Sequence, residues 1–238
     1  MKNSFLIGFL LLLCMSTVCY SQKRPLDMAI IGEPLKDFSL PVYQGGQFKL
    51  SEAKGKNILL VFPRGYYDKN IWCDICTYEY LDFIDEFHNK KFDEKYNLDL
   101  VFVLPYDNST INKWLQDLPE VYKSLEASEN PPDTTTDQRV LTWVHFAKKH
   151  YPKTFAINRG ETPVPYKILV DKDHLVSERL EIFKTEWWGT RVEQNVPTII
   201  LLDKNGTVIY KYISQHTIDR PGSDYIKSIL DAFLIAGK

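Results

Sequence analysis

Two cysteines separated by two residues are the part of this sequence best suited to chemistry. They lie in the run Trp72-Cys73-Asp74-Ile75-Cys76, between an apolar stretch and a long segment with helical periodicity. A thiolate is a strong nucleophile, and the free N–H groups at the start of a helix favour its formation. We therefore predict that Cys73 attacks a disulfide and that Cys76, one turn later, resolves the mixed disulfide, which gives a redox-active Cys73–Cys76 pair.

The same spacing also occurs in inert structural disulfides and in metal sites. Covalent haem attachment needs a histidine directly after the second cysteine, but this position holds Thr77. A structural zinc site usually has a second pair of ligands, for which His145 and His150 are the candidates. Redox chemistry is the favoured interpretation, and we predict neither a metal nor an organic cofactor.

A strand and a helix are predicted to position the two cysteines. Residues 57–62 (Asn-Ile-Leu-Leu-Val-Phe) form a continuous apolar run, as in a central strand buried on both faces. Between about residues 74 and 95, apolar side chains recur at spacings of three and four, which marks one buried helical stripe. Glu79 falls in the first turns of this helix, where it could relay a proton.

The remaining pattern predicts one α/β domain with a mixed sheet. We expect strands at 98–104 and 198–202, a hairpin partner at 207–213 and a closing helix at 223–236. Residues 129–195 are read as an elaboration of this domain. Within it, we expect helices at 140–150 and 175–188 and a short strand at 166–170.

The overall composition is that of an ordinary globular protein. The 238 residues are 44% hydrophobic and 25% charged, with a formal net charge of −2. This composition argues against a disordered chain, a polytopic membrane protein and a basic surface for nucleic acid. We therefore predict no nucleic-acid partner.

Residues 1–21 have the pattern of a signal peptide. Lys2 precedes an apolar run from Phe5 to Met15, and small residues precede Gln22. We expect an exported protein, periplasmic or secreted, whose mature chain (22–238) forms a single domain without a stable membrane span. A lipoprotein and an uncleaved N-terminal anchor are weaker alternatives. Cleavage would remove two of the four cysteines and leave the spaced pair.

Several motifs, taken in order, resemble redoxin domains. They are residues 32–40, the paired Gly45-Gly46, residues 50–56 and 59–62, the Trp72-Cys73-x-x-Cys76 motif and Val196-Pro197-Thr198. This superfamily holds the alkyl hydroperoxide reductase C/thiol-specific antioxidant (AhpC/TSA) proteins and the TlpA/ResA-like exported thiol–disulfide oxidoreductases. The resemblance covers about residues 32–127 and 195–236.

The resemblance implies a thioredoxin-like fold. This is an α/β fold with a central mixed β-sheet flanked by helices, here with an extra N-terminal hairpin and a large insert at about 129–195 before the cis-Pro strand. It implies that Pro197 packs beside the cysteines after a cis peptide bond. It also implies that Val196 offers its backbone to a substrate chain and that Trp72 covers the site.

A peroxiredoxin-like activity is the alternative within the same superfamily. Peroxiredoxins carry Thr or Ser three residues before the reactive cysteine and an Arg on a later strand. The run 77–79 after Cys76 resembles the peroxiredoxin pattern, but Cys73 replaces the Thr or Ser. Val196-Pro197 occupies the position of the late Arg, although Arg64 could reach the thiolate.

These departures favour dithiol–disulfide exchange over peroxide reduction. We expect an exported thiol–disulfide oxidoreductase that acts on a protein disulfide or dithiol and receives electrons from a redox partner protein. A peroxiredoxin-like thiol peroxidase, acting as an antioxidant protein, is the first alternative. The second is a partner-binding module in which the cysteines form a structural disulfide.

Overall fold

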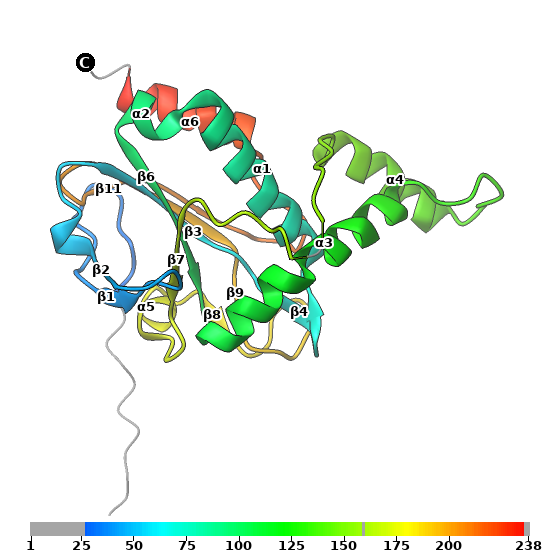
Figure 1. Cartoon of the computed structure of the whole chain (residues 1–238), viewed down its shortest axis with the longest axis horizontal. Coiled ribbons are helices and arrows are strands. Elements are labelled where there is room, and N and C mark those ends of the chain that lie inside the picture. Colours follow the sequence, from blue (N-terminus) through cyan, green and yellow to red (C-terminus); the bar gives the residue numbers. More distant parts are fainter. Residues whose placement is uncertain (1–26, 159, 236–238) are drawn as a thin grey trace, which may run out of the picture.

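A mixed five-stranded sheet forms the centre of the molecule (Figure 1). The computed structural model describes residues 27–158 and 160–235, so the predicted signal peptide lies outside the described residues. The strand order is β11-β10-β3-β6-β7. The strands are β3 (Asn57–Phe62), β6 (Leu98–Leu104), β7 (Lys167–Val170), β10 (Thr198–Leu202) and β11 (Val208–Ile213).

The sheet is parallel on one side of β3 and antiparallel on the other. β3 pairs in parallel with β6, and β6 with β7, whereas β10 runs antiparallel to both β3 and β11. Every residue of β10 is buried, as are the last five of β3, which explains their unbroken apolar sequences. The predictions of strands at 57–62, 98–104 and 198–202 are confirmed.

The two faces of the sheet are covered by different elements. One face packs against the helices α1, α3 and α6, and the other against the N-terminal hairpin and α5. The helices are α1 (Asp74–Lys90), α3 (Asn108–Glu129), α5 (Leu175–Arg179) and α6 (Ser223–Leu234), and the hairpin strands are β1 (Ser39–Pro41) and β2 (Gln47–Lys49). The predicted mixed sheet, flanking helices and N-terminal hairpin are therefore all present.

Short elements complete the chain. The predicted helix at 74–95 is divided at Lys91, whose left-handed backbone (φ +49°) ends α1 before the short helix α2 (Phe92–Tyr96). A hairpin of β4 (Tyr66–Asp68) and β5 (Ile71–Trp72) precedes α1, and a 3₁₀ turn (Leu50–Glu52) follows β2. No helix among the described residues is long and apolar enough to cross a membrane.

The segment predicted as an insert contributes to the sheet as well as projecting from it. Helix α4 (Gln138–His150) extends away from the sheet, and residues 151–158 return as an extended segment (Figure 1). The chain then forms β7 at the sheet edge and the small hairpin β8 (Phe183–Lys184)–β9 (Gln194–Asn195). The helix expected at 175–188 is wrong beyond Arg179, because Glu181 has a positive φ of +59° and cannot continue it.

Candidate active site

The two cysteines lie where β3, the β4–β5 hairpin and α1 meet. Cys73 is the N-cap of α1, and its Sγ accepts the backbone N–H of Cys76 at 3.2 Å. Its own N–H donates to the carbonyl of Gly65 at 2.9 Å. Both cysteines are free thiols, and they are only 3% and 1% exposed. The predicted placement of the pair at the start of a helix is confirmed.

A glycine turn brings the end of β3 against the cysteines. Gly65 has φ +82°, and a Cβ at this position would lie 2.4 Å from the Tyr106 ring. The Tyr106 hydroxyl accepts the N–H of Tyr66 and donates to the carbonyl of Glu193, which fixes the ring in place. Only glycine therefore fits both the backbone conformation and the space at this turn.

Trp72 is held inside the wall of the site by its neighbours. Its ring stacks on Tyr66 with centroids 3.7 Å apart, and its Nε1 donates to Asp117 Oδ2 at 2.9 Å. The residue is 4% exposed. Trp72, the residue expected to cover the site, is thus buried in its wall with Tyr66 stacked on one face of the ring.

Arg220, which the sequence reasoning missed, supplies a buried positive charge to the cysteines. It lies in the loop between β11 and α6, its side chain is 3% exposed, and its Nη2 is 4.0 Å from Cys76 Sγ. Its Nη1 donates to Ser214 Oγ at 3.1 Å and to the carbonyl of His216 at 3.4 Å. Arg220 is 144 residues away from Cys76 in the chain and belongs to no motif, so no sequence signal identifies it.

The charges around the pair place the thiolate on Cys76. Burial by itself raises the pKa of Cys76, but the hydrogen bond from Cys73, the charge of Arg220 and the Arg64 backbone outweigh it and lower the pKa to about 6. Burial and the neighbouring Cys76 raise the pKa of Cys73 well above its usual value. The two sulfurs therefore share one negative charge, which lies on the sulfur beside the guanidinium.

Glu79 faces the same cluster and holds its proton more tightly than an ordinary glutamate. It is 6% exposed and lies three residues after Cys76, on the same side of α1. Burial raises its pKa to about 8, against the lowering effect of Arg220, and the charge of Cys76 raises it further. The carboxyl group can therefore hold a proton beside the thiolate at pH 7.

Arg64 is buried but is committed to a different part of the site. Its Nε donates to Gln194 Oε1 and its Nη2 to Thr190 Oγ1, both at 2.7 Å. Its guanidinium lies 5.1 Å from the centroid of the Trp187 ring. Burial lowers its pKa, and the charges of the two cysteines oppose this effect. Through these hydrogen bonds, Arg64 connects the end of β3 to β9 and to the loop before it.

The predicted substrate loop at Val196-Pro197 is not free to receive a chain. The peptide bond before Pro197 is trans, so the expected cis bond is wrong. The N–H of Val196 donates to the carbonyl of Ile182 at 2.6 Å, and its carbonyl accepts the Thr198 hydroxyl at 2.9 Å. These contacts hold the segment in place and occupy the backbone groups that a substrate would need.

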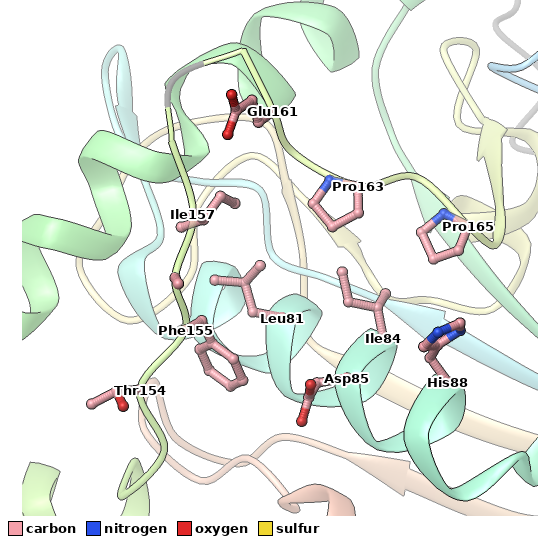
Figure 2. Close-up of a pocket in the computed structure, with 11 residues that line it drawn as sticks. Leu81, Ile84, Asp85, His88, Thr154, Phe155, Ile157, Glu161, Pro163 and Pro165 are labelled. Carbon is pink, nitrogen blue, oxygen red and sulfur yellow. The ribbon is translucent and has the colours of Figure 1, made fainter.

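Two cavities border elements that position the cysteines, and Arg220 lines one of them. The first, of about 450 Å³, is bounded by α1 and by residues 154–157 and 161–165, and neither cysteine lines it (Figure 2). The second, of about 500 Å³, lies between α4, β11 and the start of α6, and Arg220 and His150 are among its lining residues. The second cavity is therefore the approach closest to the thiolate.

His145 and His150, the candidate second pair of zinc ligands, do not lie in a metal-ligand group with the two cysteines. Within residues 27–158 and 160–235, no group of three or more His, Cys, Asp or Glu side chains could hold a metal ion. A zinc site built from the two cysteines with His145 and His150 is therefore not formed by these residues.

Comparisons with known proteins identify the family. The AhpC/TSA family model matches residues 31–211, and no curated protein sequence matches the chain. Among solved structures, a cysteine-to-serine mutant of the peroxiredoxin 6 of Arenicola marina is similar, with a TM-score of 0.57 and 12% identity over 88% of this chain and 75% of that one. The reduced 2-Cys peroxiredoxin of Plasmodium vivax has a TM-score of 0.50 and 18% identity, over 85% of this chain and 94% of that one.

These structural similarities confirm the expected thioredoxin-like α/β fold. The family match extends over most of the chain, from before β1 into β11. The protein is a member of the AhpC/TSA family of redox enzymes.

Proposed function

We propose that the protein reduces peroxides, with Cys76 as the attacking thiolate and Cys73 as the resolving thiol. The observation that supports this role is the buried guanidinium of Arg220 against Cys76 Sγ. A fixed cation beside the sulfur keeps it ionised, and it can also stabilise the oxygen that leaves when the peroxide bond breaks. Arg220 thus supplies the positive charge that peroxiredoxins take from a late Arg, a position that Val196-Pro197 occupies in this chain.

The cycle follows from the two thiols. The Cys76 thiolate attacks one peroxide oxygen and the O–O bond breaks, which leaves a sulfenic acid and an alcohol or water once the leaving oxygen takes a proton. Glu79 holds a proton in the same cluster. The Cys73 thiol then attacks the Cys76 sulfur, water leaves, and a disulfide forms. An external dithiol reduces the disulfide and returns both sulfurs to the starting state.

The burial of both sulfurs supports a small oxidant. Cys73 and Cys76 are 3% and 1% exposed, and the backbone of Val196 is already hydrogen-bonded. A protein disulfide has to displace more of the surrounding structure than a peroxide does before it can touch either sulfur.

Dithiol–disulfide exchange with a protein is the second candidate. It is favoured by the position of Cys73, whose Sγ caps α1 and receives a backbone N–H. In this reaction, Cys73 attacks the substrate disulfide and Cys76 resolves it, as the sequence alone predicts. Either reaction takes electrons from a partner thiol protein, and we propose on the pattern of residues 1–21 that it occurs after export.

Single-turnover chemistry separates the two candidates. Purified protein is incubated with hydrogen peroxide, or with insulin and a dithiol, and sulfenic acid is trapped with dimedone. We expect peroxide reduction by the wild type, a trappable Cys76 sulfenic acid in Cys73→Ser, and no reaction in Cys76→Ser. The second candidate would be supported if the wild type reduced insulin but not peroxide, and if Cys73→Ser lost the insulin reduction. Full biological activity in the double variant would support a partner-binding module.

A further inference from the structure

A buried ionic cluster lies on α1, further along the helix than Cys76. Asp82 and Glu86 are one turn apart, and their side chains are 5% and 10% exposed. The ammonium group of Lys153 lies 2.5 Å from Asp82 Oδ1 and 2.7 Å from Glu86 Oε1. Lys153 belongs to the extended segment after α4, so it connects the predicted insert to the catalytic helix.

The same cluster fixes the start of α6. Asp82 Oδ2 accepts the backbone N–H of Ser223, and Asp82 Oδ1 accepts its hydroxyl, both at 2.9 Å. Lys153 Nζ is also 3.1 Å from Ser223 Oγ. Ser223 is the first residue of α6 and follows Arg220 by three positions. The loop that carries Arg220 is thus held by Ser214 and His216 on one side and by Asp82 on the other.

The segment around Lys153 is itself firmly placed on α1. Exposure alternates from residue 151 to 158, as in a strand with one face covered. The N–H of Lys153 donates to the Tyr78 hydroxyl, and the N–H of Phe155 donates to the Tyr122 hydroxyl, both at 3.1 Å. Figure 2 shows Phe155 and Ile157 on the side of the segment that faces α1. These contacts fix the point from which the lysine reaches the carboxylates.

From this arrangement we infer that Lys153 is a positioning residue that holds Arg220 against Cys76. Its ammonium pairs with Asp82 and Glu86 and lies beside Ser223, so it holds the Asp82 carboxylate where it binds the start of α6. Lys90 also pairs with Glu86, at 2.5 Å, so the carboxylate that depends on Lys153 is Asp82. Without the ammonium of Lys153, the Asp82 carboxylate lies one turn from that of Glu86 with no cation between them, and repulsion turns it away. This movement weakens the bonds to Ser223 and releases the loop that carries the guanidinium.

The inference rests on the proposed role of Cys76 as the thiolate, but its test needs no substrate. The ionisation of Cys76 is followed by the ultraviolet absorbance of the thiolate and by mass-mapped alkylation with iodoacetamide as a function of pH. For Lys153→Met, we expect the apparent pKa of Cys76 to rise by about one unit, so that alkylation at pH 6 slows about fivefold. Lys153→Arg keeps the charge and should restore most of the wild-type profile.

Matched variants separate positioning from a general loss of structure. Lys227→Met removes the ion pair between Lys227 and Asp231 within α6, which shares no partner with Lys153 or Arg220, and should leave the profile unchanged. Ser223→Ala keeps Lys153 and both carboxylates but removes one bond to Asp82, and should raise the pKa in the same direction. An unchanged profile in Lys153→Met or, if that variant does not fold, in Ser223→Ala would overturn the inference. A shift in this profile together with an absence of peroxide reduction would uphold it and reject the proposed function.

Discussion

The chemistry of the site depends on which of two adjacent sulfurs carries the charge. The N-terminal end of α1 favours a thiolate on Cys73, whereas the guanidinium of Arg220 favours one on Cys76. A full positive charge in a buried site exceeds the partial charge of a helix end, so the second effect dominates. Cys73 then keeps its proton and donates it towards Cys76, which suits a resolving thiol.

The reactivity of the wild-type protein should follow the ionisation of Cys76. Because the folded state lowers the pKa of Cys76 to about 6, alkylation at this residue should rise as the pH increases through 6 and level off by pH 7. Cys73, whose pKa is raised, should stay unreactive over this range. Mass-mapped alkylation between pH 4 and 9 measures both residues. Alkylation of Cys73 first would assign the thiolate to the other sulfur.

Replacing Arg220 by Met should raise the pKa of Cys76 towards the ordinary value for cysteine. The methionine fills similar space but removes the charge, so only the hydrogen bonds from Cys73 and the Arg64 backbone still oppose the effect of burial. We expect peroxide reduction at pH 7 to fall at least about tenfold, because only a small fraction of Cys76 stays ionised. Arg191→Met, at an arginine that is 80% exposed and paired with Glu186, is the control. Equal losses in the two variants would contradict a specific role for Arg220.

At the scale of elements, the turn between β3 and β4 should be among the least tolerant positions of the fold. Gly65→Ala introduces a Cβ at φ +82° and 2.4 Å from Tyr106, whose hydroxyl is held at both Tyr66 and Glu193. Gly206→Ala has a similar φ of +86° but open space around it, so it isolates the backbone strain. We expect the control to lose about 1 kcal/mol of unfolding free energy and Gly65→Ala at least about twice that.

Urea denaturation of both variants measures this difference, and the alkylation rate of Cys76 reports on the site. Because the Gly65 carbonyl receives the Cys73 N–H, the displaced turn should also slow alkylation in Gly65→Ala but not in Gly206→Ala. Equal losses of unfolding free energy in Gly65→Ala and Gly206→Ala would mean that the Tyr106 ring can move aside without destabilising the fold.

Elements with a strong local pattern could be predicted from the sequence, whereas long-range placement could not. The apolar run of β3 and the capped start of α1 locate the cysteines correctly, because burial and helix capping act over a few residues. The position of β7 at the sheet edge, within a segment predicted as an insert, depends on pairing with β6 far back in the chain. Arg220 is a similar case, since its charge acts only once α6 is docked on α1.

At the scale of the whole molecule, oxidation of the two cysteines to a disulfide removes the thiolate charge that faces the buried guanidinium of Arg220. Reducing the disulfide takes up two electrons and, below about pH 6, two protons. Above this pH only one proton is taken up, because Cys76 stays ionised beside Arg220. The reduction potential should therefore fall by about 59 mV per pH unit below pH 6 and by about 30 mV per unit above it.

Redox titration against glutathione between pH 5 and 8 measures these slopes. Glu79, with a pKa of about 8, titrates near the upper end, so the same titration in Glu79→Gln separates its contribution. In Arg220→Met, the change of slope should move to higher pH, since the thiolate loses its counter-charge. A constant slope of about 59 mV per unit up to pH 8 in the wild type would show that both thiols keep their protons. That result would remove the electrostatic basis for assigning the attack to Cys76.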